Sequence, residues 1–308
     1  MFRNYLKLAI KVLGRRKFFT FISLFGISFT LMVLMVIMAF LDTELGANPP
    51  MTEADRMVLI DRLEMRTNYY DTIWTIDSSL VEGVMVYDTT DYETQDAGRS
   101  QSSGSVGLRA FREFLHDVQP QEMYAAMFNR PFDVFQEGRK YQMEGIYTDA
   151  EYWQILDFTF KEGRPFNRAE VDGAQSVMVI TDRMAREFFG TDENIVGREI
   201  PLSGRQFEVV GLVARTRSSS QFTRADVYIP ITTADEQIIG SESLQGPCRA
   251  IFLAPSVAER EALQDALHYE GTQLPIPAEQ DYEEIRIFAF NVGISRKKPS
   301  MQKSTKRK

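Results

Sequence analysis

The longest apolar stretch of the chain runs from Phe18 to Leu41, FFTFISLFGISFTLMVLMVIMAFL, without a charged residue. As a helix, its 24 residues span roughly 36 Å, slightly more than the ~30 Å core of a bilayer. The alternative is a cleaved signal peptide, whose apolar region is shorter and ends in a small-x-small site that Met38-Ala39-Phe40 does not provide. The pattern therefore predicts one retained transmembrane helix over residues 18–41.

Residues 1–17, before the apolar run, carry six bases and no acid, whereas Asp42 and Glu44 follow it. Positive charge stays on the cytoplasmic side, so we expect a cytoplasmic N-terminus and translocation of everything from residue 42 onward. Apolar and basic positions of residues 2–13 fall on different faces of a helix. This predicts an amphipathic segment at the cytoplasmic interface, and an ordinary basic flank with incidental periodicity is the alternative.

Beyond residue 50, short apolar runs of strand period alternate with a few stretches of helical period. This pattern predicts an α+β domain over residues 42–295. Two β-α-β units, at roughly 57–128 and 248–290, are expected to build one split, ferredoxin-like subdomain. A strand-rich subdomain, about 129–225, is inserted between them, and Val177–Ile180 is its candidate central strand.

Two polar segments show no such period. Residues Thr89–Ser105 (TTDYETQDAGRSQSSGS) are rich in Gly and Ser, which predicts a mobile loop after a hairpin-like pair of strands at Thr72–Ile76 and Gly83–Tyr87. Residues 296–308 carry seven bases and no acid, and we expect a disordered basic tail there.

The charge is unevenly distributed along the 308 residues. The net charge is −8, but the two basic ends leave 22 bases against 43 acids in residues 18–295. An acidic body repels nucleic acid, so we expect no nucleic-acid partner. The single cysteine, Cys248, excludes an intramolecular disulfide and a cysteine-based metal knuckle.

No residue set predicts catalysis, cofactor binding or a metal site. The chain has no phosphate-binding G-x-x-x-x-G-K-[ST], so it is not expected to be its own ATPase. Cys248 with His268 as its base would be a nucleophile, but a lone cysteine beginning an apolar strand is ordinarily a packed residue. The remaining candidates have ordinary structural or solvated interpretations: His116 at a helix end, the acids Asp281, Glu283 and Glu284, and Arg164 and Arg198 after glycines.

Several segments resemble a known family when taken in order. Asn4–Lys11, Arg15–Phe19 and Leu24–Ser28 resemble the N-terminus of the permease subunits of MacB/FtsX-type ABC transporters. The middle of the chain resembles their periplasmic core domain through a longer series: Gly145-Ile146-Tyr147, DFTFKEGRPF over Asp157–Phe166, Val177–Ile180, Phe189-Gly190, Gly197–Ile200, Phe207–Gly211 and Val227–Pro230.

The resemblance implies a non-enzymatic permease subunit in a bacterial inner membrane, single-pass here, with its main domain in the periplasm. Such a subunit transmits ATPase-driven conformational change for export, lipoprotein release or signalling. The implied partners are a cytoplasmic ABC ATPase subunit, a second copy or a related permease, and the lipid bilayer. Family members carry three more transmembrane helices after this domain, which residues 291–308 do not begin. We therefore expect a truncated permease or, alternatively, a single-span periplasmic adaptor or sensor without ABC coupling.

Overall fold

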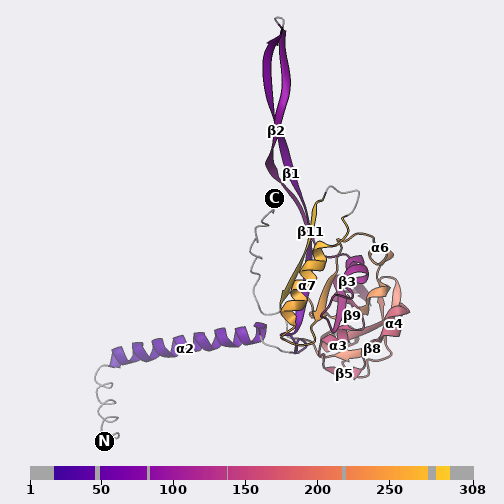
Figure 1. Cartoon of the computed structure of the whole chain (residues 1–308). Helices are drawn as coiled ribbons and strands as arrows, with labels where there is room; N and C mark the ends of the chain where they lie inside the picture. The colour runs from indigo at the N-terminus through magenta and orange to yellow at the C-terminus, as the bar shows by residue number, and fades with distance from the viewer. Residues whose placement is uncertain are drawn as a thin grey trace. The chain divides into compact units, whose positions relative to one another are not determined.

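The structure is a computed structural model that describes residues 17–45, 49–81, 84–136, 138–216, 220–276 and 282–291 (Figure 1). The chain forms two compact units, Met1–Asn48 and Pro49–Lys308. The predicted amphipathic segment and the basic tail 296–308 lie outside the described residues, and the predicted domain boundaries remain predictions.

The first unit contains helix α2, Lys17–Leu45. Its apolar side chains are exposed along its length, and within it residues Lys17–Phe40 are long and apolar enough to cross a membrane. The Thr30 hydroxyl donates to the carbonyl of Gly26 at 2.8 Å, so this polar group is satisfied within the helix. The predicted helix over the apolar run is confirmed.

The second unit is built on one eleven-stranded sheet, and four of its strands form the predicted ferredoxin-like half. Their order is β11-β1-β10-β3, in which every neighbouring pair is antiparallel. β1 thus runs parallel to β3 and β10 parallel to β11, and a helix crosses between the members of each pair. This is the split pair of β-α-β units expected from the sequence. The elements are β1 Met57–Val81, η1 Ala110–Leu115, β3 Met123–Gln136, β10 Arg249–Leu253, α7 Arg260–Thr272 and β11 Glu284–Asn291.

The segment between β3 and β10 extends the same sheet in the order β4-β9-β6-β8-β5, with β7 on β8. β3 and β4 form a long hairpin, so the sheet passes without a break from the ferredoxin-like half into the insertion. The elements of the insertion are β4 Arg139–Thr148, α3 Tyr152–Ile155, β5 Phe160–Gly163, α4 Arg168–Asp172, β6 Val177–Thr181, α5 Asp182–Phe189, β7 Glu199–Leu202, β8 Arg205–Val213, β9 Val227–Pro230, η2 Ile231–Thr233 and α6 Glu236–Ile239.

Local sequence signals account for the strand and the helix at the centre of the insertion. All five residues of β6 are buried, and β6 lies between β8 and β9, as expected of the apolar run Val177–Ile180. The Thr181 hydroxyl then accepts a hydrogen bond from the backbone of Met184 and begins α5. Gly190 ends that helix at φ 74°, a conformation that favours glycine.

The polar segment Thr89–Ser105 differs from the prediction of a mobile loop. It is not a loop: most of it belongs to strand β2, Val84–Gly104, which pairs antiparallel with β1 from Leu63 to Val81 through two register shifts. The composition is typical of a loop, but backbone pairing satisfies the amide groups of a strand whichever side chains it carries. The hairpin expected near Thr72–Ile76 therefore extends much further in both directions.

Candidate functional site

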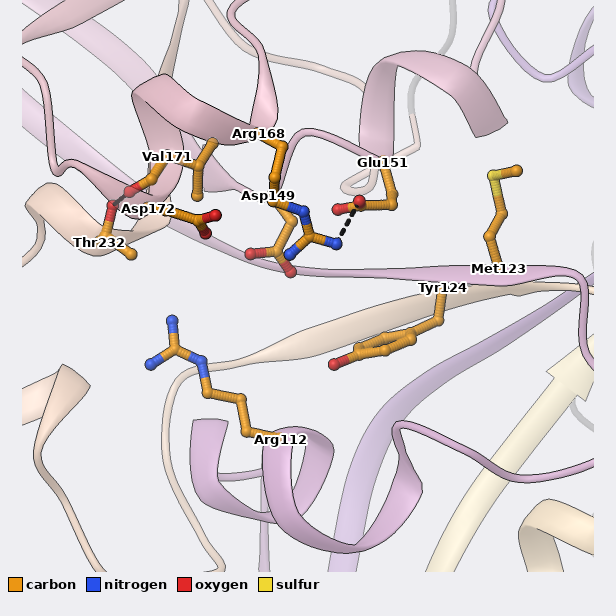
Figure 2. A pocket seen from close by; sticks show the side chains of 9 residues that line it. All are labelled: Arg112, Met123, Tyr124, Asp149, Glu151, Arg168, Val171, Asp172 and Thr232. Atoms are coloured by element: carbon orange, nitrogen blue, oxygen red, sulfur yellow. Dashed lines mark hydrogen bonds and ion pairs between the residues drawn. The ribbon is translucent and has the colours of Figure 1, made fainter.

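A cleft of about 650 Å³ opens where the ferredoxin-like half meets the insertion. η1 and the start of β3 supply one wall, and the end of β4, α4 and η2 supply the other (Figure 2). Most of the lining side chains are charged, and none of them is a serine, cysteine or histidine nucleophile. The lining residues are Arg112, Met123, Tyr124, Asp149, Glu151, Arg168, Val171, Asp172 and Thr232.

Asp149 is the most enclosed carboxylate of the cleft. It follows the last residue of β4, and its Oδ2 accepts a hydrogen bond from the backbone N–H of Ala126 in β3 at 3.0 Å. Burial raises the pKa of Asp149 to about 6, against the opposing effects of the Ala126 hydrogen bond and the Arg112 charge. Asp149 therefore ties β4 to β3 at the base of the cleft and changes charge close to neutral pH.

Arginines flank this carboxylate on both walls. Arg112 reaches from η1 on one side, whereas Arg168 lies on the opposite side and is ion-paired with Glu151 (Figure 2). The Tyr124 ring stacks on Phe252 at 5.3 Å, and burial raises the pKa of its hydroxyl to about 12, so Tyr124 stays protonated. The cleft thus presents charges of both signs on walls that belong to different parts of the fold.

Arg164 fixes the α4 wall. Two of its nitrogens donate to the Glu170 carboxylate at 2.8 and 2.7 Å. Glu170 also forms a capping box with Asn167 at the start of α4, and Arg164 is the main cause of the lowered pKa of Glu170. The Thr232 hydroxyl donates to the carbonyl of Val171 and joins η2 to the same helix. Arg164 is thereby placed as a support for the wall rather than as a lining group.

The candidate nucleophile and base lie in settings that oppose that chemistry. Cys248 is buried, and burial raises the pKa of its thiol to about 12, which disfavours the reactive thiolate. The Nε2 atom of His268 accepts a hydrogen bond from the backbone N–H of Ala289 at 3.1 Å, and burial lowers the pKa of His268. Each side chain is committed to the packing around it.

The other candidates have structural contacts. His116 ends η1, and its carbonyl accepts a hydrogen bond from the Gln121 side chain. The Arg198 guanidinium lies 5.2 Å from the ring centre of Phe189. Glu284 is ion-paired with Arg286 at 2.7 Å. Asp281 lies outside the described residues, and within those residues no group of three His, Cys, Asp or Glu side chains could hold a metal ion.

Sequence patterns did not point to the cleft. Arg112 and Asp149 are 37 positions apart, and each sits beside apolar residues in a segment whose periodicity predicts only an element. Asp149 is a single acid at the end of an apolar strand, a pattern that also describes many ordinary turn residues. Only the pairing of β3 with β4 and the packing of η1 bring these groups together.

Most of the chain matches a known protein family. Residues 20–268 match the family model of the MacB-like periplasmic core domain. The chain belongs to this family. The match begins within α2 and continues through β1, the insertion and β10 into α7, so it includes the apolar helix and both walls of the cleft. This MacB-like chain thus combines an apolar helix with a periplasmic core domain of a permease family.

Part of the chain is similar in sequence to two transport proteins. The chain is 29% identical over 121 residues to the pyoverdine export ATP-binding/permease protein PvdT of Pseudomonas aeruginosa. It is 29% identical over 119 residues to the macrolide export ATP-binding/permease protein MacB of Chlorobium luteolum. These matches cover 39% and 38% of this chain but only 18% of each relative.

A solved structure shares the fold. A domain of a putative permease protein from Porphyromonas gingivalis superimposes with a TM-score of 0.52 and 14% sequence identity. The match covers 78% of this chain and 91% of that domain. The likeness supports the α+β architecture of the MacB-like chain.

Proposed function

We propose that this chain acts as a permease-type, non-ATPase part of an ABC transporter, transmitting ATPase-driven movement across the membrane for export, lipoprotein release or signalling. One observation carries the proposal. The family match begins inside α2 and continues into the core domain, so the family signature treats the apolar helix and the domain as one unit. A helix that enters a bilayer and is followed along the chain by a folded domain is a route for mechanical force.

The proposed setting is a bacterial inner membrane, with the N-terminus in the cytoplasm and the core domain in the periplasm. The bases of residues 1–17 and the acids Asp42 and Glu44, which flank the apolar run of residues 18–41, support this orientation. The proposed partners are a cytoplasmic ATPase subunit and a second permease, either another copy or a related chain. The names of the two relatives, which combine ATP binding with permease, support the first of these partners.

Within the domain, the cleft is the proposed point of movement. Its two walls are joined through the β3–β4 hairpin, so a change in the twist of the sheet changes the width of the cleft. Arg112 and Arg168 stand on opposite walls, and Asp149 lies at the base between them (Figure 2). Because charged side chains can be solvated when the cleft opens, opening costs less here than in an apolar core.

A distance measurement tests the proposal. Spin labels at His116 of the η1 wall and Asp172 of the α4 wall, both exposed, report the width of the cleft in nanodiscs that also hold the cognate ATPase. A non-hydrolysable ATP analogue is expected to shift the distance distribution. A control pair at Asp172 and Glu193, both within the insertion, is expected to stay unchanged.

A distribution that is identical with and without nucleotide, in an assembly that hydrolyses ATP, would contradict the proposed coupling. It would favour the alternative function, a membrane-anchored periplasmic adaptor or sensor without ABC coupling. Equal shifts in the test pair and the control pair would place the movement inside the insertion instead of at the cleft.

A further inference from the structure

The distal parts of β1 and β2 form a ribbon without a third strand. β11 pairs with β1 only as far as Arg66, and β10 only from Met57 to Ile60. Residues 67–81 and 84–100, here called the distal ribbon, pair with one another and with no other strand in the described part of the chain. Figure 1 shows the two strands extending as a twisted ribbon past β11, whose first residue, Glu284, pairs with Arg66.

The strand register gives the distal ribbon two unlike faces. Trp74 lies opposite Tyr92, their ring centres 5.5 Å apart, and Ile76 and Met85 occupy positions on the same side. These four side chains, here called the aromatic face, are between 48% and 61% exposed. The other side carries Ile73 and four acids at neighbouring positions, here called the acidic face: Asp71, Asp77, Asp91 and Glu93.

Such a ribbon is poorly supported on its own. A two-stranded hairpin is at best marginally stable in water, and stability requires further strands or a layer packed on its apolar side. The aromatic pair supplies the large, amphipathic contact area that is enriched in interfaces. The aromatic face therefore needs a cover that the described residues of this chain do not provide.

The negative charge of the ribbon limits which partners can pack on its aromatic face. Residues 67–104 contain seven acids and one base, a net charge of −6, so an anionic lipid surface repels the ribbon. A strongly basic partner would engage the acidic face and leave the aromatic face uncovered. A second copy of the chain fits both faces, because the aromatic faces of two ribbons can pack together while both acidic faces remain in solvent.

Like charge does not prevent this pairing. Sheets packed face to face lie about 10 Å apart, so acids on the two outer faces are separated by more than that distance. The Debye length at physiological ionic strength is ~8 Å, and the repulsion is largely screened. A two-fold arrangement uses the same patch on both copies, which is the commonest symmetry of homodimers.

We propose that the aromatic face of the distal ribbon is a homodimer interface, which packs against the aromatic face of a second copy of this chain. Such an interface does not require ATPase coupling, and it would be the surface that joins two copies of the chain. Two chains held in one membrane by their apolar helices are at high effective concentration, so a ribbon contact of modest affinity suffices.

Site-specific crosslinking tests the interface in the full chain in nanodiscs. Ser78→Cys and Thr72→Cys place thiols on the aromatic side, and Asp77→Cys and Asp71→Cys are their matched controls on the acidic side. Cys248 is buried and serves as the common background. A short bismaleimide is expected to give dimers several-fold faster from the aromatic-side set. Equal rates from the two sets would overturn the proposal.

A second pair of variants distinguishes dimerisation through the ribbon from dimerisation through α2, because all variants retain α2. Trp74→Ser with Tyr92→Ser is expected to lower crosslinking from Ser78→Cys about tenfold, the scale of losing an aromatic anchor. Asp77→Ser with Asp91→Ser is expected to leave crosslinking equal or faster. Circular dichroism checks that both variants stay folded. No loss in the aromatic variant would refute the interface.

Fluorescence distinguishes a lipid cover from a second copy. After Trp153→Phe, Trp74 is the only tryptophan of the chain. Its emission is expected to shift to the blue as the number of chains per nanodisc rises, and to shift further with salt. A blue shift in discs that hold a single chain, appearing only when phosphatidylglycerol is included, would show that lipid covers the face and would overturn the proposal.

Discussion

Asp149 is a carboxylate of the cleft whose pKa the fold raises. Its ordinary pKa is near 3.8, and burial raises it to about 6. Between these two values the folded chain holds a proton that the unfolded chain has released. This carboxylate therefore makes the fold less stable as the pH rises from about 4 to about 6, and the loss persists at higher pH.

Replacing Asp149 by asparagine removes this loss, because the amide carries no charge and its oxygen can still accept from Ala126. We expect Asp149→Asn to be about 3 kcal/mol more stable than the wild-type chain at pH 7.5, because each unit by which the pKa is raised costs about 1.4 kcal/mol, with no difference near pH 4. Urea unfolding followed by circular dichroism across that range measures both values. The control is Asp172→Asn, an exposed carboxylate of the same cleft, for which the same difference is expected to be small.

An Asp149→Asn variant less stable than wild type at every pH would show that the Ala126 hydrogen bond needs the carboxylate charge. The cost of burial would then not dominate at this position.

At the scale of elements, the apolar and polar pattern predicts well where a helix or strand needs one buried face. Val177–Ile180 reads as a central strand because all its side chains are apolar, and Thr181 and Gly190 mark the ends of the next helix. The pattern is misleading for β2, whose residues Thr89–Gly104 pair with β1 although none of the side chains described there is buried. Hydrophobic periodicity reports burial, and β2 is held by backbone pairing instead.

The topology of α2 gives a prediction at the same scale. Alkaline phosphatase, which is active only outside the cytoplasm, is expected to be active when fused after Gly46, because the six bases of residues 1–17 stay in the cytoplasm. A variant with Arg15→Glu, Arg16→Glu and Lys17→Glu removes half of these bases and is expected to lower the activity. If a reporter that is active only in the cytoplasm were active when fused after Gly46 of the wild-type chain, the orientation would be the opposite one. The proposed function would then be wrong as well.

At the scale of the whole molecule, the unit from Pro49 onward contains a continuous core that extends across both halves of its sheet. We expect residues 49–291, expressed without α2, to fold as a soluble unit without metal. The basis is that core, together with the lack of a metal-binding group among the described residues. Thermal unfolding with EDTA and with added Zn²⁺ or Ca²⁺ is expected to agree within about 2 °C. A rise of many degrees with one metal would reveal a site.

The amino-acid sequence by itself determined the apolar helix, the α+β class, the split β-α-β arrangement and most strands of the insertion. Each depends on local periodicity or on the order of segments along the chain, and both are present in one dimension. The family resemblance follows from the same order.

The tertiary structure decided what depends on pairing between distant segments. The order β11-β1-β10-β3 joins to β4 only through the β3–β4 hairpin, and this places Arg112 of η1 across the cleft from Arg168 of α4. Register with β1 converts a loop-like segment into a ribbon and separates Trp74 and Tyr92 from the acids that alternate with them. A strand's side chains acquire a common face only when its partner and register are set, so neither the cleft nor the two faces could be predicted from composition.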